Sequence, residues 1–115
     1  MGEYAFANTA IEEVNLSKLS TIPKFAFSNC RKLWSVTLGN NLLIIDDSAF
    51  MNNRSLLSIH LPSSLTSING SAFYGCTKLS TVTLGAGAEI GMYAFGESGL
   101  STVNLLGGKV TIDDA

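Results

Sequence analysis

The dipeptide Ala-Phe recurs at nearly constant intervals, and this recurrence constrains the fold more than any other feature of the chain. The five copies are Ala5-Phe6, Ala26-Phe27, Ala49-Phe50, Ala72-Phe73 and Ala94-Phe95, at intervals of 21, 23, 23 and 22 residues. Five of the six phenylalanines in the 115 residues stand in this one position. A fixed period of about 20 to 30 residues indicates a solenoid, in which every repeat forms one coil.

Aliphatic residues follow each Ala-Phe at matched positions and end in an apolar-polar-apolar alternation. This alternation predicts a short strand with one buried face. A single strand cannot bury that face alone, but five strands stacked in parallel cover one another. We therefore expect a β-rich solenoid with little helix, in which the Phe rings stack coil over coil and Ala permits a tight turn. The aliphatic residues of the second and third repeats are Leu33, Val36, Leu38, Leu56, Ile59 and Leu61.

The segment 56–76 resembles the BspA-like, or Treponema pallidum-type, class of leucine-rich repeats. The residues that carry the resemblance are Leu56, Ile59, Leu61, Pro62, Leu65, Ile68, Ala72, Phe73 and Cys76. Departures from it include Gly39 and Gly85 in place of Pro62, and Asn53 in place of the Cys. The first and fifth repeats also lack one residue between the Phe and the first aliphatic residue. The resemblance implies a right-handed leucine-rich-repeat coil with short parallel strands on its concave face. It also implies a non-catalytic adhesion or protein-binding module of a cell-surface or secreted protein.

The repeat boundaries predict one solenoid domain over residues 1–115. Five repeats of 21–23 residues fall near 5–25, 26–48, 49–71, 72–93 and 94–115. Neither end shows a polar capping repeat, so we expect a piece of a longer array whose uncapped ends associate end to end. The first residues lack the pattern of a signal peptide, so the extracellular or cell-surface location follows from the resemblance alone.

Charge and cysteine usage narrow the classes of function. Seven basic residues against nine acidic ones give a net charge of −2, which disfavours nucleic-acid binding. No apolar run reaches the roughly 18–20 residues that membrane insertion requires. Metal-ligand spacings and cofactor motifs are absent, so we expect no cofactor. Cys30 and Cys76 share one position two coils apart, about 9–10 Å, and this is too far for a disulfide.

Outward-facing strand positions predict where a partner binds. In a stack of parallel strands, equal positions of successive repeats form columns. Most outward residues carry hydroxyl or amide groups, but Trp34 and Leu57 should be exposed neighbours with His60 close by. An exposed Trp beside a Leu is typical of an anchor for a protein partner, such as a host or matrix protein. The predicted binding residues are Trp34, Leu57, His60, Thr37, Thr83 and Asn104.

Three alternatives remain open at this stage. Trp34 packs over its own loop or over Arg31 or Lys32, in which case it is no anchor. The repeats act as a structural spacer without a ligand of their own. Trp34 stacks on a sugar ring, and Thr and Asn side chains bind its hydroxyls, so the surface recognises carbohydrate. His60 has no paired Cys or Ser and no orienting carboxylate nearby, so we do not expect an enzyme.

Overall fold

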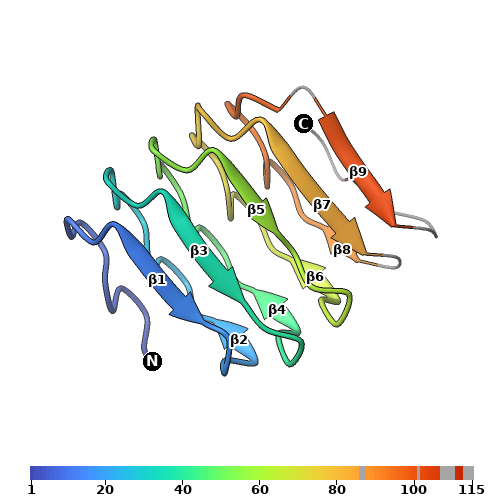
Figure 1. Cartoon of the computed structure of the whole chain (residues 1–115), viewed down its shortest axis with the longest axis horizontal. Coiled ribbons are helices and arrows are strands. Elements are labelled where there is room, and N and C mark those ends of the chain that lie inside the picture. Colours follow the sequence, from blue (N-terminus) through green and yellow to red (C-terminus); the bar gives the residue numbers. More distant parts are fainter. Residues whose placement is uncertain (86–87, 101, 107–110, 113–115) are drawn as a thin grey trace.

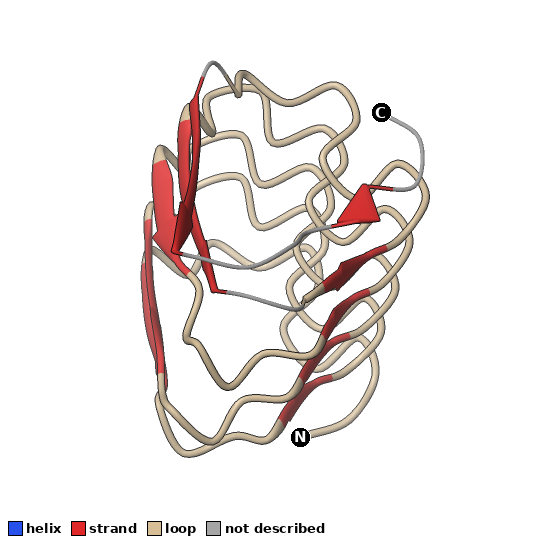
Figure 2. Cartoon of the chain, turned by 90° about the vertical axis from the view of Figure 1, so that its right-hand side faces the viewer, coloured by secondary structure: helices blue, strands red, loops and turns tan. Residues whose placement is uncertain are grey.

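The chain winds into a stack of coils with a wall of strands on each of two opposite sides (Figures 1 and 2). The computed structural model describes residues 1–85, 88–100, 102–106 and 111–112. None of these residues is helical, and turns and loops connect the two walls. This confirms the β-rich solenoid, whereas the assignment of all 115 residues to one domain stays a prediction.

Strands of the two walls alternate along the chain. The long-strand wall, predicted to be concave, contains β1 (Glu13–Leu16), β3 (Ser35–Leu38), β5 (Ser58–His60), β7 (Thr81–Gly85) and β9 (Thr102–Leu106). The short-strand wall contains β2 (Thr21–Ile22), β4 (Ile44–Ile45), β6 (Ser67–Ile68), β8 (Glu89–Ile90) and β10 (Thr111–Ile112). Each coil contributes one strand to each wall, as the two apolar phrases of each repeat require.

All pairings between strands are parallel and join equal repeat positions. Glu13 of β1 is the partner of Ser35 in β3, and Thr81 of β7 is the partner of Thr102 in β9. The short-strand wall is one five-stranded sheet, in the order β10-β8-β6-β4-β2. The long-strand wall is divided into a two-stranded sheet, β1-β3, and a three-stranded sheet, β5-β7-β9. The predicted columns therefore exist, with an interruption between β3 and β5 that the pattern does not predict.

A stack of phenylalanine rings occupies the core between the walls. Phe27, Phe50 and Phe73 are fully buried, and the successive ring centroids lie 5.4 and 5.3 Å apart with nearly parallel planes. Phe6 and Phe95 extend the stack at its two ends, each 5.3 Å from its neighbour. The predicted stacking of the Phe rings is confirmed, and it fixes which residues of neighbouring coils lie side by side.

The turn around each Ala-Phe uses left-handed residues on both sides of the dipeptide. In the second coil these are Phe25 and Asn29, with φ of 58° and 59°. Ala26 lies within this turn and is fully buried, while the left-handed φ angles fall on the residues that flank the dipeptide. The left-handed residues are Tyr4, Asn8, Phe25, Asn29, Ser48, Asn52, Ser71, Gly75, Tyr93 and Glu97.

Both cysteines are free and buried, as their two-coil separation predicts. Each thiol donates to the carbonyl of a Phe in the preceding coil, Cys30 to Phe6 and Cys76 to Phe50, with S···O distances of 3.1 Å. Burial raises the pKa of the Cys76 thiol to about 12, and a hydrogen bond from the backbone of Asn53 opposes this shift. The thiols therefore behave as small core residues.

Candidate functional site

The outer surface of the long-strand wall arises from the two-residue period of its strands. In β5 the side chains of Ser58 and His60 are exposed, while Ile59 between them is 5% exposed and packs in the core. Parallel pairing repeats this arrangement in the next coil, where Thr81 is opposite Ser58 and Thr83 is opposite His60. The surface is consequently rich in hydroxyl groups on a backbone that both the core and the sheet hold in place.

Among the side chains that the structure describes, Trp34 and Leu57 are the large exposed apolar ones next to the strands of this wall. Trp34 is 52% exposed and Leu57 is 56% exposed. They directly precede β3 and β5, one coil apart. The N–H of Trp34 donates to the carbonyl of Glu12 at 2.9 Å, and the carbonyl of Leu57 accepts from Ser80 at 3.0 Å. Because backbone bonds tie each residue to a neighbouring coil, these apolar groups are held at the surface.

The break in the sheet passes between these two residues. Trp34 leads into β3 of the β1-β3 sheet, and Leu57 leads into β5 of the β5-β7-β9 sheet. Buried contacts on the other side of the coil still keep the second and third coils in register, because the Phe27 and Phe50 rings stack and Ile45 pairs with Ile68. The apolar pair therefore spans a junction between two sheets.

The other predicted site residues lie on the same wall. Thr37 and His60 are exposed, and Thr83 is half-buried. His60 and Thr83 are direct partners across β5 and β7, and Thr83 pairs in turn with Asn104 of β9. The backbone of Asn104 thus continues the column, while its side chain lies outside the described part of the structure.

A hollow of about 330 Å³ lies on this wall beside the predicted residues. Its lining residues are Glu13, Val14, Asn15, Ser35 and Thr37. Of these, only Thr37 is among the predicted binding residues. The outward columns defined by the repeat offsets do include Glu13, Asn15 and Ser35. The depth of a hollow, however, depends on the spacing and angle between strands, and the repeat offsets do not predict these. The exposed carboxylates of Glu12 and Glu13 make this end of the wall acidic.

The described part of the chain shows no group of three or more His, Cys, Asp or Glu side chains that could hold a metal ion. Within the same residues, no helix has the length and apolar character needed to cross a membrane. The wall offers noncovalent chemistry: an indole and an isobutyl group for apolar contact, and hydroxyl, imidazole and carboxylate groups for hydrogen bonds.

The chain is similar throughout its length to one family of repeats. The family described as the BspA type leucine rich repeat region (6 copies) matches residues 1–115. No curated protein matches the chain at a significant level.

Two solved structures share the fold. A leucine-rich cell surface protein from Faecalibacterium prausnitzii A2-165 has a TM-score of 0.86 and 25% sequence identity, and the match covers 93% of this chain and 29% of that protein chain. A leucine-rich repeat protein from Bacteroides capillosus ATCC 29799 has a TM-score of 0.64 and 27% identity, with 93% and 62% covered. This chain therefore spans less than two thirds of the length of either protein.

Proposed function

Because this chain belongs to the BspA-type leucine-rich repeat family, we propose that it is a non-catalytic binding module whose long-strand wall engages a protein partner outside the cell. The observation that carries this proposal is the pair of exposed apolar side chains, Trp34 and Leu57, on adjacent coils of the long-strand wall. Side chains of this kind, surrounded by polar groups that exclude water from the contact, supply most of the binding energy in protein interfaces.

The surroundings of the pair support a protein partner. Thr37 and His60 are exposed on the strands that follow the two anchors, and they offer hydrogen bonds at the rim of the contact. The hollow next to them, about 330 Å³ with Glu13 in its lining, fits a side chain that carries a positive charge. A protein segment with an apolar residue next to a basic one has the complementary chemistry.

The proposed location outside the cell rests on similarity. The F. prausnitzii protein is a leucine-rich cell surface protein, and its coils superpose on those of this chain. An extracellular location agrees with a surface of neutral hydroxyl and amide groups. It also defines the set of partners to test, which are proteins of the extracellular matrix or of another cell's surface.

Replacing Trp34 and Leu57 by Ala tests the proposal with a matched control. Leu43 is 46% exposed and directly precedes β4 of the short-strand wall, so Leu43→Ala removes the same side chain from the opposite side. We expect Leu57→Ala and Trp34→Ala each to weaken binding by about 2 kcal/mol or more, measured by surface plasmon resonance on a panel of immobilised matrix proteins. Leu43→Ala should leave binding unchanged.

The same variants distinguish the alternatives. Equal affinities for all three variants and the unchanged protein would show that the wall is a spacer or that another face binds. Binding to glycan arrays that only Trp34→Ala abolishes would favour carbohydrate recognition on the long-strand wall. Circular dichroism of each variant confirms that the solenoid is intact.

A further inference from the structure

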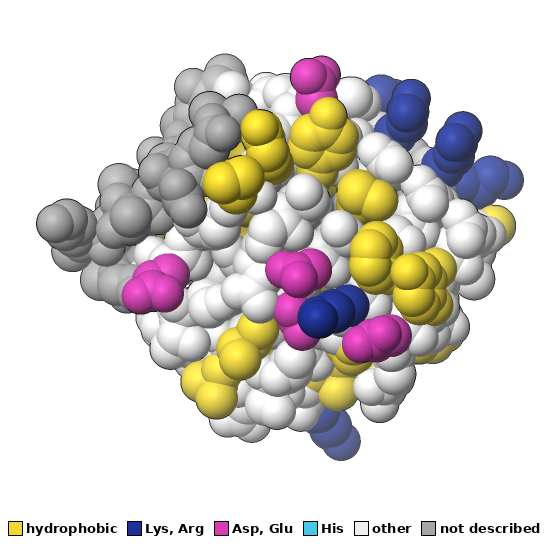
Figure 3. Space-filling model, turned by 180° about the vertical axis from the view of Figure 1, so that it is seen from behind, with side chains coloured by type: hydrophobic (Ala, Val, Ile, Leu, Met, Phe, Trp, Pro, Cys, Tyr) yellow, Lys and Arg dark blue, Asp and Glu magenta, His cyan; other side chains and the backbone are white. Residues whose placement is uncertain are grey.

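Basic side chains gather at one edge of the solenoid, although the whole chain is slightly acidic. Four of its seven basic residues fall in the loop that leads from the Ala-Phe turn to the long-strand wall, and all four are exposed. We call this surface the basic edge. Its members are Arg31, Lys32, Arg54 and Lys78. Figure 3 shows Lys and Arg side chains grouped along one upper edge, apart from most Asp and Glu side chains.

Hydrogen bonds between coils hold the basic edge in register. The hydroxyl of Ser55 donates to the carbonyl of Arg31, and the N–H of Cys30 donates to Oδ1 of Asn53 at 3.0 Å. Arg31 and Arg54 are therefore fixed on adjacent coils, with a backbone spacing of about 4.8 Å. Lys32 and Lys78 occupy equal positions two coils apart. The loop therefore carries basic residues on three successive coils along the axis of the stack, with Arg at one repeat position and Lys at the next.

The neighbouring positions of this loop are neutral and polar. Ser55 and Thr77 stand between the basic residues, and Thr9 and Ala10 occupy the same loop in the first coil. No acidic residue occupies these loop positions in the described coils. Glu97, in the adjoining turn of the fifth coil, is the acidic residue that lies next along the stack. The edge is therefore positively charged over three successive coils.

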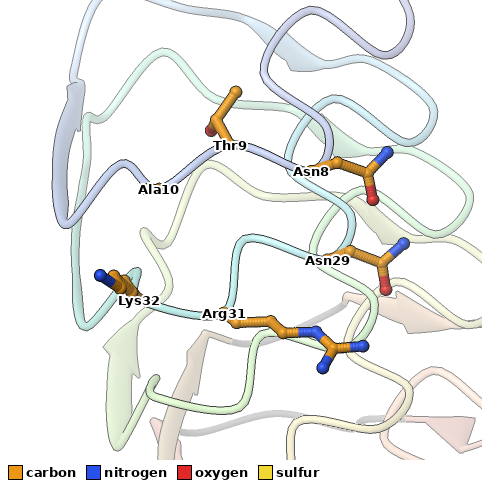
Figure 4. Close-up of a pocket in the computed structure, with 6 residues that line it drawn as sticks. All are labelled: Asn8, Thr9, Ala10, Asn29, Arg31 and Lys32. Carbon is orange, nitrogen blue, oxygen red and sulfur yellow. The ribbon is translucent and has the colours of Figure 1, made fainter.

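A hollow deepens the edge at its first two coils. It measures about 380 Å³, and it is lined by Asn8, Thr9, Ala10, Asn29, Arg31 and Lys32. In Figure 4 the side chains of Asn8, Asn29 and Arg31 project to the same side of the loops, and Lys32 projects to the other. Amide and guanidinium N–H groups thus stand together at the surface, where they can donate to carboxylate or sulfate oxygens.

We propose that the basic edge binds an extended acidic polysaccharide, whose sulfate or carboxylate groups contact the Arg and Lys side chains of successive coils. This site goes beyond the proposed protein contact, because it lies in the loops and not on the long-strand wall. A polysaccharide is favoured over an acidic protein because the edge has no apolar anchor, and stable protein contacts depend on such anchors. A nucleic acid is disfavoured because the edge has no aromatic side chain on which bases could stack.

Retention on immobilised heparin, measured as the salt concentration that elutes the whole chain, tests this proposal. Arg31→Gln with Arg54→Gln removes two charges from the edge, while Lys18→Gln with Lys24→Gln removes two exposed charges elsewhere. Exposed charge contacts contribute up to a factor of about five each, so we expect the first pair to weaken binding by roughly tenfold. The Lys pair and Trp34→Ala should elute with the unchanged protein, and the slope of affinity against salt should decrease only for the Arg pair.

Three results would overturn the proposal. The first is an equal decrease in heparin retention for the Arg double variant and the Lys double variant, which would indicate that retention depends on net charge alone. The second is absence of retention at low salt. The third is tighter binding to polyglutamate or to single-stranded DNA than to heparin. Because Trp34→Ala is measured in the same series, failure at the edge is distinguished from failure of the protein-binding wall.

Discussion

The rings of Phe27 and Phe50 stack with their centroids 5.4 Å apart and their planes inclined by 8°. This contact joins residues 23 positions apart in sequence and places the second coil directly on the third. The N–H of Phe27 also donates to the carbonyl of Ala49 at 2.8 Å, so the backbone follows the same register as the rings. The repeated Phe of the Ala-Phe dipeptide, which is visible in the sequence, therefore makes the contact that aligns the coils.

Phe50→Ala should destabilise the fold strongly. Its ring is fully buried between Phe27 and Phe73, and the truncation opens a cavity in the stack, at a cost of about 3–5 kcal/mol in the free energy of unfolding. Phe6 stands at the end of the stack and is 37% exposed, so Phe6→Ala should cost clearly less. Urea denaturation monitored by circular dichroism measures the free energy of unfolding of both variants. An equal decrease for Phe50→Ala and Phe6→Ala would contradict the stabilising role of the buried stack.

Asn53 is a buried polar residue at the position that Cys30 and Cys76 occupy in the two neighbouring coils. Its Oδ1 accepts the N–H of Cys30 at 3.0 Å, while its Nδ2 has no hydrogen-bond partner in the part of the chain that the structure describes. Asn53→Ala leaves a buried N–H unpaired and should cost about 1–3 kcal/mol. Asn41→Ala, at an exposed position, should change the unfolding free energy by less than about 0.5 kcal/mol; indistinguishable denaturation midpoints would refute the importance of this bond.

The Cys76 thiol should make stability decrease at alkaline pH. Its pKa is raised by burial from the ordinary 9.0 to about 12. The unfolded chain loses this proton above pH 9 while the folded chain keeps it, so the stabilisation is complete below pH 9 and is lost as the pH rises towards 12. Between pH 8 and 10.5 the unfolding free energy should therefore fall more steeply for the unchanged protein than for Cys76→Ala. Parallel curves would argue against a buried neutral thiol.

Glu97 occupies a left-handed turn position that holds Asn or Gly in the other coils. Its φ is 52°, against 76° for Gly75 at the equivalent position. The left-handed conformation costs an L-residue about 1–2 kcal/mol, a cost that glycine does not have. Glycine offsets part of this advantage, because it gives the unfolded chain more backbone entropy. Glu97→Gly should therefore stabilise the protein by about 0.5–1 kcal/mol. Glu89→Gly, in the extended strand β8, should destabilise it, and thermal denaturation of the two variants provides the comparison.

Repeat offsets predict most of this fold because equal positions must lie in columns once the Phe rings stack. Ser58 opposite Thr81 and His60 opposite Thr83 follow from counting residues alone. The exposure of Trp34 and Leu57 follows from the same offsets. The part of the site that could be predicted is therefore the set of outward-facing residues at equal repeat positions.

Other features could not be predicted from the apolar pattern. Val36 and Ile59 keep their positions on either side of the break between β3 and β5, so nothing in the sequence marks the missing backbone pairing there. Asn8, Asn29 and Asn52 do signal one left-handed position, because Asn adopts it readily. The other left-handed position, directly before each Ala-Phe, holds Tyr, Phe or Ser, and these residue types do not indicate a left-handed conformation. The basic edge could not be predicted from the net charge of the chain, because a net charge does not show how the charged residues are distributed over the surface.

The binding wall and the basic edge are continuous surfaces only if residues at equal repeat positions lie next to one another. Pairs of introduced cysteines measure this directly. Ser58 and Thr81 are direct partners in parallel strands, with Cα atoms about 4.8 Å apart, within the range of a disulfide. Ser35 and Thr81 lie two coils apart, at about 9–10 Å, beyond that range.

Oxidation of each double variant, followed by peptide mapping, therefore tests the columns. Cys30 and Cys76 are buried and should remain thiols in both variants. The stack of coils predicts that Ser58→Cys with Thr81→Cys closes an intrachain disulfide in the monomer, and that Ser35→Cys with Thr81→Cys does not. Closure of the second pair, or failure of the first in a folded protein, would contradict the arrangement of residues in columns.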